Sequence, residues 1–380
     1  MRDILPNLRG WWGARTPFAL ATVTGTRGSA PRDPGAAMAV GAAGEVVGSV
    51  SGGCVESAVV VEAQDVLASA TARTVTFGYS DEDAFAVGLT CGGEIDVFVQ
   101  RVDAATMPCF GDLAAAVAAE APAALATVIA GPANVGSTLL VRPAQLGRGR
   151  IPDHLGTLGA DGLDAAVLDD ARGMLSQGQT DVRHYGANGE RRIDDVAVFV
   201  SSFAPRPRLL VFGAIDFAAA VARAGAFLGY HVTVCDARAT FATARRFPQA
   251  DDVVVEWPDR FLRGATVDCR TVICVLTHDP KFDVPLLEVA LRTDAAYIGA
   301  MGSRETHAER LDLLRQRGLT EDELTRLSSP IGLDIGARTP EETAVSIAAE
   351  IIQRRWGGSG RPLGETQGAI HRDRQPPVGT

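Results

Sequence analysis

One short run sets the predicted fold of the second half of the chain: Leu209-Leu210-Val211-Phe212-Gly213-Ala214-Ile215-Asp216-Phe217-Ala218. Its apolar start is typical of a buried parallel strand, and the glycine after it is typical of a tight turn into a helix. Outward from this run, the same alternation predicts strands at 209–212, 231–235, 252–255, 271–276 and 296–299, with helices at about 216–228, 284–292 and 304–317. A last helix is expected from Thr339-Pro340-Glu341-Glu342, a capping box with proline at the first helical position. We therefore predict a Rossmann-like, doubly wound parallel sheet over residues 208–356.

The turn after the first of these strands is an imperfect dinucleotide-binding motif. In Gly-x-Gly-x-x-Gly/Ala, the second glycine lets a diphosphate approach the backbone, and here Ile215 stands at that position. Asp216 follows and adds a negative charge. Gly213 and Asp236, the acid that closes the second strand, are candidate nucleotide-binding residues. The Ile215 side chain makes NAD(P) binding doubtful.

Polar residues follow two more strands of this predicted sheet, where ligands bind in such folds. Thr277-His278-Asp279 follows the fourth strand, and Gly302-Ser303-Arg304 follows the fifth and opens a helix. His278 is a candidate acid–base group or ligand, and a hydrogen-bonded structural histidine is the alternative. Gly302, Ser303 and Arg304 are a candidate anion site, with simple helix capping as the alternative.

The chain has a candidate linker and a candidate tail. Two prolines within residues 204–208 favour a stiff extended connector, so we expect an N-terminal domain at 1–203 and a C-terminal domain at 208–356. Gly357-Gly358-Ser359-Gly360 opens a polar tail to residue 380. This tail has too little apolar surface to order itself and is predicted to be mobile.

Residues 1–203 contain an internal repeat. Ala19-Leu20-Ala21-Thr22-Val23 recurs as Ala124-Leu125-Ala126-Thr127-Val128, and residues 48–67 match 156–175 at a constant offset of 108. The matched segments predict two α+β copies, at about 15–100 and 120–201, with helices at about 54–70 and 162–178. Chance similarity among alanine- and valine-rich segments is the alternative.

The copies differ where chemistry is expected. The first carries Ser51-Gly52-Gly53-Cys54 before its helix and Cys91-Gly92-Gly93 before its last strand, whereas the second has Gly159-Ala160-Asp161-Gly162 and no second cysteine motif. Glycine N–H groups at a helix N-terminus suit an anion, and a thiol there has a lowered pKa that suits metal or sulfur chemistry. A tight turn with a packed cysteine is the alternative.

A third motif of the first copy is the loop Arg27-Gly28-Ser29-Ala30-Pro31-Arg32-Asp33-Pro34-Gly35. Its guanidinium groups suit phosphate or carboxylate, which makes Arg27, Ser29 and Arg32 candidate ligand-binding residues. A surface loop with solvated arginines is the alternative.

Composition narrows the class of protein. With 380 residues, 46% hydrophobic and 22% charged, the chain has the balance of a globular protein of two or three domains. A net charge of −10 makes nucleic acid and anionic membranes poor partners. No apolar run is long enough for a membrane span and the N-terminus lacks signal-peptide features, so a cytoplasmic location is expected. The six cysteines contain no CxxC pair, which argues against a zinc knuckle and predicts that most are buried.

Taken together, these elements resemble the XdhC/CoxI family, the accessory factors of xanthine dehydrogenase and related molybdenum hydroxylases. The resemblance spans about residues 15–355, in family order. It rests on residues 28–32, 48–56, 91–93, 277–279, 297–304 and 330–336. One departure is Ile215-Asp216, where the family usually has glycine followed by histidine.

The resemblance implies a homodimeric protein that binds molybdenum cofactor (molybdopterin) and protects it while an oxo ligand is exchanged for a terminal sulfido ligand. It then delivers the cofactor to an apo molybdenum hydroxylase, and a sulfur donor protein is a second implied partner. Cys54 and Cys91 would lie near the metal or its sulfur, and Arg27 and Arg32 would hold the phosphate. Thiolates suit such a soft metal better than carboxylates do.

Two other functions stay open from the sequence. One is an NAD(P)-linked oxidoreductase that uses the Rossmann half, with His278 as acid–base group. The other is a scaffold that binds only the client protein. Whether the chain has catalytic activity of its own is also left open.

Overall fold

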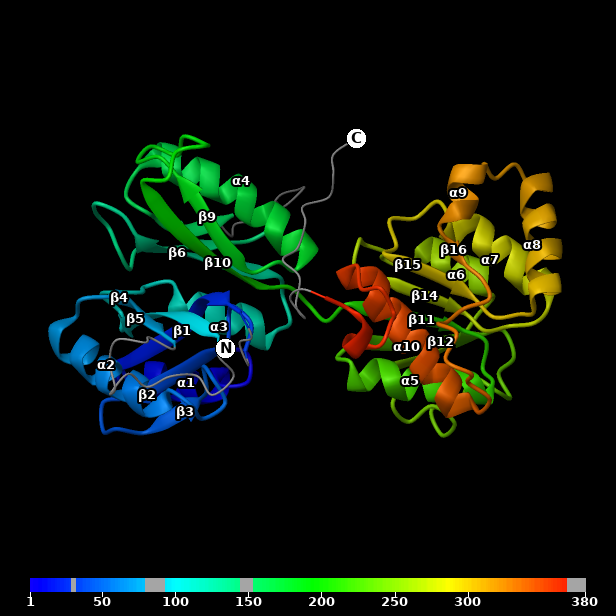
Figure 1. Ribbon diagram of the computed structural model, residues 1–380, viewed down its shortest axis with the longest axis horizontal. Helices are drawn as coiled ribbons and strands as arrows, with labels where there is room; N and C mark the ends of the chain where they lie inside the picture. Colours follow the sequence, from blue (N-terminus) through cyan, green and yellow to red (C-terminus); the bar gives the residue numbers. More distant parts are fainter. Residues whose placement is uncertain (29–31, 79–92, 144–152, 368–380) are drawn as a thin grey trace. The chain divides into compact units, whose positions relative to one another are not determined.

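The computed structural model describes residues 1–28, 32–78, 93–143 and 153–367 (Figure 1). The chain divides into two compact units, with the division between Pro205 and Arg206. The first unit contains two five-stranded antiparallel sheets, and the second contains a six-stranded parallel sheet. The predicted fold class, a duplicated α+β half followed by a Rossmann-like half, is confirmed.

The two sheets of the first unit have the same topology. The first copy consists of β1 (Phe18–Arg27), β2 (Ala37–Gly41), β3 (Val46–Gly48), α2 (Glu56–Ser69), β4 (Arg73–Phe77) and β5 (Glu94–Val102). The second consists of β6 (Ala123–Ala130), β7 (Thr138–Val141), β8 (His154–Gly156), α4 (Asp161–Gln177), β9 (Asp181–Tyr185) and β10 (Val196–Phe203). Their strand orders, β3-β2-β1-β5-β4 and β8-β7-β6-β10-β9, correspond strand for strand. The internal repeat is therefore a structural duplication.

Equivalent glycines end the third strand of each copy. Gly48 and Gly156 have φ values of +83° and +94°. A Cβ atom at these positions would lie 2.4 Å from the Ala37 carbonyl oxygen and 2.3 Å from the Thr138 carbonyl oxygen. Both copies thus need glycine at the same turn for the same steric reason.

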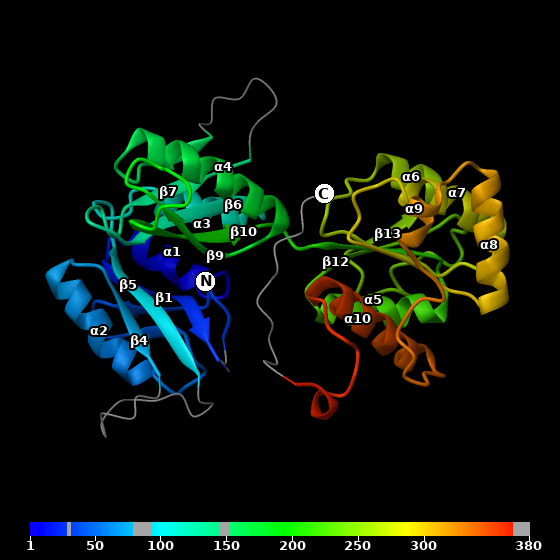
Figure 2. The same ribbon diagram turned by 45° about the horizontal axis from the view of Figure 1, so that its top comes forward.

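Each sheet of the first unit has one face covered by its own helix. In α2 the buried residues Val59 and Ala63 face the sheet, and in α4 Val167 and Ala171 occupy the equivalent places at the offset of 108. Figure 2 shows α2 lying along β4 and β5. The opposite faces of the sheets share a core with α1 (Leu5–Gly13) and α3 (Phe110–Ala118), and this core includes Phe18, Leu20, Leu125 and Phe203. The two copies therefore form one unit.

The second unit is a parallel sheet covered by helices on both faces. Its elements are β11 (Arg208–Phe212), α5 (Asp216–Phe227), β12 (His231–Asp236), β13 (Asp252–Val255), α6 (Pro258–Gly264), β14 (Val272–Val275), α7 (Pro280–Ala290), β15 (Tyr297–Ala300), α8 (Arg304–Gln316), α9 (Glu321–Thr325), β16 (Leu327–Ser328) and α10 (Pro340–Trp356). Helices α5 and α10 pack on one face, and α6 to α9 pack on the other (Figure 1). The strand order β13-β12-β11-β14-β15-β16 reverses direction between β11 and β14. In such folds, ligands bind at the carboxyl ends of the strands at this switch point.

Several helix boundaries follow from capping. The predicted capping box of α10 is present, with Thr339 and Glu342 exchanging hydrogen bonds. Helix α7 begins at Pro280, four residues before the predicted start at 284, because the Asp279 side chain accepts a hydrogen bond from the N–H of Lys281. Helix α2 begins at Glu56, two residues after its predicted start.

The structure describes the predicted mobile tail only in part. Gly357 ends α10 with φ +67°, and a single 3₁₀ turn follows at Leu363–Glu365. The tail beyond residue 367 lies outside the described residues. Within the described ranges, the helices are too short or too polar to cross a membrane.

Candidate functional site

The loop between β3 and α2 carries Ser51, Gly52, Gly53 and Cys54, and it is organised around the carboxylate of Glu56. One oxygen, Oε1, accepts from the Ser49 hydroxyl at 2.5 Å, the Ser51 N–H at 2.9 Å and the Gly52 N–H at 3.1 Å. The other, Oε2, accepts from the Ser51 hydroxyl at 2.7 Å, the Gly53 N–H at 2.9 Å and the Val55 N–H at 3.2 Å. The carboxylate thus joins both ends of the loop.

This arrangement corrects one expectation from the sequence. The N–H groups of Ser51, Gly52 and Gly53 were expected to hold a ligand anion, but in the structure they hold the chain's own Glu56. Partial burial alone would raise the pKa of Glu56, but hydrogen bonds from Ser49, Ser51 and the backbone outweigh it and lower the pKa to about 2. The carboxylate is therefore ionised throughout the physiological range. A role of Ser51, Gly52 and Gly53 in cofactor binding stays a prediction, and it needs contacts other than these N–H groups.

The outer side of the loop is open. Among the described residues, no atom would lie within 4 Å of a Cβ atom added at Gly52 or Gly53, although φ values of +82° and +122° favour glycine at both positions. Cys54 is partly buried and packs against the core of its copy, and its N–H donates to the Ser51 hydroxyl at 3.0 Å. Within the described part of the chain, the loop therefore leaves free space at two consecutive glycines that directly precede Cys54.

The second copy has a reduced version of this loop. Asp164, at the offset of 108 from Glu56, accepts from the Thr157 hydroxyl at 2.7 Å and from the Leu158 N–H at 2.7 Å. Its side chain is one methylene shorter, and at the offset of 108 the places of Gly52, Gly53 and Cys54 are taken by Ala160, Asp161 and Gly162. The copies share the carboxylate but differ in the groups presented to a ligand.

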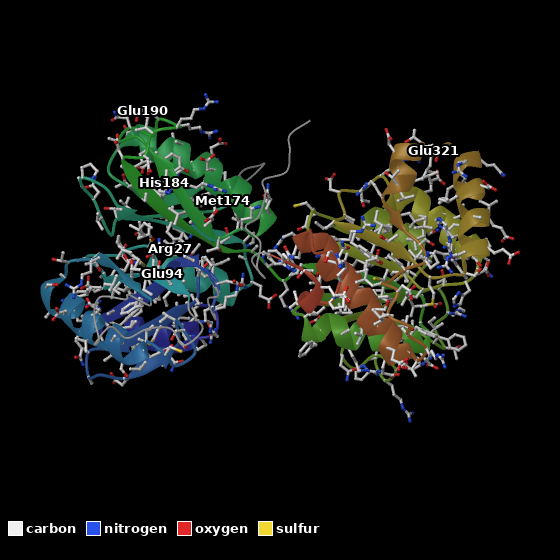
Figure 3. The ribbon with its side chains drawn as sticks, viewed as in Figure 1. Arg27, Glu94, Met174, His184, Glu190 and Glu321 are labelled. Atoms are coloured by element: carbon white, nitrogen blue, oxygen red, sulfur yellow. The ribbon has the colours of Figure 1, made fainter. Side chains whose placement is uncertain are left out.

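The Arg27 guanidinium belongs to a surface ion-pair cluster. Its Nε donates to Glu94 at 2.7 Å and an Nη donates to Asp96 at 3.2 Å, between the facing ends of β1 and β5 (Figure 3). The hydrogen bond to Glu94 is the main reason that the pKa of Arg27 is raised. A phosphate bound by Arg27, as predicted from the sequence, would therefore compete with the carboxylates of Glu94 and Asp96 for its guanidinium group. Arg32, the other predicted phosphate ligand, has an exposed side chain.

The second cysteine motif is described only in part. Gly93 is buried next to the start of β5, while Ser29, Cys91 and Gly92 lie outside the described residues. Because β5 begins opposite the end of β1, Gly93 and Arg27 lie at the same end of the sheet. Among the described residues, no three His, Cys, Asp or Glu side chains come together as metal ligands. The predicted metal ligands Cys54 and Cys91 stay a prediction.

The switch point of the parallel sheet places Gly213 against the end of β14. A Cβ atom on Gly213 would lie 3.0 Å from the backbone nitrogen of Thr277, and its φ of +108° also favours glycine. The next N–H, that of Ala214, donates to the Asp236 carboxylate at 2.7 Å. Asp236 is buried and paired with Arg238 through Nε at 2.9 Å and Nη2 at 2.7 Å. Asp236, a predicted nucleotide-binding residue, is thus held by donors of the protein itself.

Asp216 in the same turn is paired as well. Arg246 contacts its carboxylate at 3.2 Å and also donates to the Ala214 carbonyl at 3.1 Å. Ile215 has extended backbone angles and precedes the first turn of α5. The negative charge expected to repel a diphosphate is therefore partly neutralised, whereas the Ile215 side chain remains at the position of the second glycine.

A buried ion pair joins the ends of three neighbouring strands. Arg310 of α8 pairs with Asp283 of α7 at 3.0 Å, and both side chains are almost fully buried. Arg310 also donates to the Met301 carbonyl at 2.8 Å and to the Ser329 hydroxyl at 3.1 Å, while the Thr277 hydroxyl donates to Asp283. Thr277, Met301 and Ser329 follow or end β14, β15 and β16 respectively. This network fixes the loops that carry the predicted site residues of the second unit.

These loops expose His278 and Arg304. Ser303 caps α8 by accepting the Thr306 N–H at 3.0 Å, and the preceding Gly302 has φ +154°. Capping, the alternative weighed from the sequence, thus accounts for Ser303. The predicted roles of His278, Gly302, Ser303 and Arg304 toward a ligand remain predictions.

Sequence reasoning missed Glu56 and the Asp283–Arg310 pair. A signal for Glu56 was present, because Glu56 and Asp164 match at the offset of the repeat. Asp283 and Arg310 lie 27 residues apart in separate helices, and the pattern of either helix gives no sign that they meet.

The fold and these loops define a class of protein: a duplicated α+β unit with a glycine–cysteine loop, followed by a Rossmann unit. The family of XdhC and CoxI matches residues 11–78 and 116–186, one segment in each copy, and the XdhC Rossmann domain matches residues 209–351. The chain belongs to the XdhC and CoxI family.

Relatives cover most of the chain. It is 27% identical to a protein of Bacillus subtilis, named as a probable xanthine dehydrogenase component, over 88% of this chain and 92% of that protein. It is 26% identical to "Molybdenum cofactor insertion chaperone PaoD" of Escherichia coli over 88% of this chain and 83% of that protein. A crystal structure titled as a xanthine dehydrogenase from Bacillus halodurans has the same fold, with a TM-score of 0.68, 24% identity and coverage of 96% and 98% of the two chains.

Proposed function

We propose that this protein binds molybdenum cofactor and serves as its maturation and insertion factor for an apo molybdenum hydroxylase of the xanthine dehydrogenase type. Family membership supports the proposal, as does the likeness to a protein named as a molybdenum cofactor insertion chaperone. The cofactor is the cargo of this function, and the partners are the apo-hydroxylase and a sulfur donor protein. We further propose a cytoplasmic homodimer.

The observation that carries the proposal is the open glycine–cysteine loop of the first copy. Molybdopterin combines a flat pterin, a phosphate and a soft metal that favours thiolate ligands. Gly52 and Gly53 leave room for a flat ring, and Cys54 places a thiol beside it. Bound here, the cofactor would supply the metal centre at which an oxo ligand is exchanged for sulfido.

The remaining roles are assigned to the chain's own residues. Cys54 and Cys91 bind the metal or its sulfur, Gly92 and Gly93 belong to the cofactor-binding residues, and Arg32 holds the phosphate. Arg27 joins Arg32 only if the phosphate displaces Glu94 or Asp96 from its guanidinium group.

A second candidate function is that of an NAD(P)-linked oxidoreductase with His278 as acid–base group. The strand order of the second unit and Asp236 at the end of β12 favour it. Ile215 at the glycine position and the hydrogen bond from Ala214 to Asp236 argue against it. We therefore rank it below cofactor delivery.

A cysteine variant tests the proposed function. Cys54→Ser should lower the amount of molybdopterin that co-purifies with the full chain, because a hydroxyl is a poorer ligand for a soft metal. Pterin content per protein is measured by fluorescence after oxidation, and Cys269→Ser is the matched control because Cys269 is exposed in the other unit. Equal pterin content in wild type, Cys54→Ser and Cys91→Ser would contradict thiolate binding.

A further inference from the structure

The loop of the first copy has the geometry of an anion-binding nest. Gly52 and Gly53 both have positive φ values, and the N–H groups of Ser51, Gly52 and Gly53 point to one place. Consecutive N–H groups in such a conformation form a concavity that binds phosphate or carboxylate. In this protein the concavity is occupied by the carboxylate of the chain's own Glu56.

Both carboxylate oxygens of Glu56 accept hydrogen bonds from the donors of the nest. Each of Oε1 and Oε2 accepts from one hydroxyl and two N–H groups. A second anion at the loop would find these donors engaged and would meet a full negative charge behind them. The loop is therefore closed to the anionic part of any ligand.

Glu56 also controls the backbone of Cys54 through Ser51. The Ser51 hydroxyl donates to Oε2 at 2.7 Å and accepts from the N–H of Cys54 at 3.0 Å and of Val55 at 3.1 Å. Without the carboxylate, the Ser51 hydroxyl loses the acceptor that orients it, and the N–H groups of Ser51, Gly52, Gly53 and Val55 each lose a hydrogen-bond acceptor. The Cys54 backbone, and with it the Cys54 thiol, then loses one of the contacts that position it.

We propose that Glu56 is the positioning residue of this loop: it occupies the nest permanently, so that the loop presents Cys54 and the open glycine surface to the uncharged part of the cofactor. The phosphate is then held by other residues. The inference rests on the proposed function for the identity of the ligand, but the positioning itself does not depend on it.

The duplication supplies a natural control for this inference. Within the described residues, the Asp164 side chain accepts two hydrogen bonds from its loop, and that loop has no thiol to position. Replacing Asp164 therefore removes an equivalent carboxylate from the same unit without touching Cys54.

The test measures how fast iodoacetamide alkylates Cys54 in the full chain, by peptide mass spectrometry with Cys269 as internal reference. Glu56→Gln should accelerate Cys54 several-fold, because either orientation of the amide turns an NH₂ group toward donors that need an acceptor. Asp164→Asn should leave the rate unchanged. An unchanged rate in Glu56→Gln, or an equal change in both variants, would overturn the positioning role.

Chemical rescue separates positioning from general stability. In Glu56→Ala the nest is vacant, so acetate should slow the alkylation of Cys54 back toward the wild-type rate, with a thermal melt confirming that the variant is folded. Inorganic phosphate should leave the wild-type rate unchanged. Failure of acetate to rescue a folded Glu56→Ala, or slowing of the wild type by phosphate, would refute the filled nest.

Pterin content of the same variants distinguishes the two claims. If Glu56 positions Cys54 and Cys54 binds the cofactor, Glu56→Gln should contain less pterin than wild type and its Cys54 should be alkylated faster. Faster alkylation with undiminished pterin would uphold positioning and contradict the proposed role of Cys54 in cofactor binding.

Discussion

At the scale of single residues, carboxylates organise the backbone at both candidate sites. Glu56 gathers the donors of the glycine–cysteine loop, and Asp236 gathers the Ala214 N–H and the Arg238 side chain. In both places, groups that the sequence suggested for a ligand are taken by the protein: the N–H groups of the glycine–cysteine loop, and the carboxylate of Asp236. A sequence pattern gives the presence of donors near a helix N-terminus, but it does not give which acceptor they find.

Asp236 leads to a stability prediction. Asp236→Asn should cost about 1–3 kcal/mol, because the amide places an NH₂ group where the Ala214 N–H or Arg238 needs an acceptor. Asp216→Asn is the control, since Asp216 lies in the adjoining turn with an exposed side chain. Urea denaturation gives the difference in free energy of unfolding, and equal values for the two variants would show that the buried pairing is unimportant.

Asp236 should also make the stability of the protein depend on pH in the acidic range. Burial acts to raise the pKa of Asp236, but Arg238 and the Ala214 N–H outweigh it and hold the pKa below its ordinary value of 3.8. A lowered pKa means that this stabilisation is present above the ordinary value and is lost as the pH falls through it and below. Wild type should therefore lose more stability than Asp236→Asn on acidification through about pH 4. Parallel pH curves for both proteins would contradict this pairing.

At the scale of elements, patterns of apolar residues were good predictors. The duplication was visible because residues that face the sheet, such as Val59 and Val167, keep a fixed offset. The parallel strands were visible because strands buried on both faces are continuously apolar. The short elements α9 and β16 were not predicted, because five and two residues are too few to show a period.

Side-chain contacts between elements that are distant in the sequence could not be predicted either. The Asp283–Arg310 pair ties α7 and α8 to the ends of three strands, and only the tertiary fold brings these side chains together. Conversely, the Ser303 cap and the α10 capping box are local, and their residues could be recognised in the sequence.

The buried ion pair gives the prediction at this scale. Arg310→Met should cost about 3–5 kcal/mol, because it leaves the Asp283 charge buried without its partner. Arg315→Met, in the same helix but with a half-exposed ion pair, should cost less than about 1 kcal/mol. Replacing both members of the buried pair, by Arg310→Met and Asp283→Leu, should recover much of the loss. A similar small loss for Arg310→Met and Arg315→Met in urea would rule out a structural role for the pair.

At the scale of the whole molecule, the two units differ in what the sequence could reveal. The Rossmann fold of the second unit was predictable, but its use was not, because fold alone does not determine function. In the first unit, the motif order was enough to predict the family, whereas the filled nest and the pairing of Arg27 required the three-dimensional structure.

The second unit should not bind NAD(P) as it stands. Isothermal titration of the full chain with NAD⁺ and NADP⁺ should show no binding in the submillimolar range, because Ile215 stands at the motif position where glycine lets a diphosphate approach the backbone. Ile215→Gly combined with Asp216→His should recover some affinity if this turn alone is the obstacle. Clear submillimolar binding by the wild type would contradict this account and favour the oxidoreductase.

The most direct measurement for the central claim is mass spectrometry of the ligand that the full chain carries when purified from its own host. The account predicts molybdopterin, at higher occupancy in wild type than in Cys54→Ser. A nicotinamide nucleotide in place of a pterin, or equal pterin in the two proteins, would contradict it.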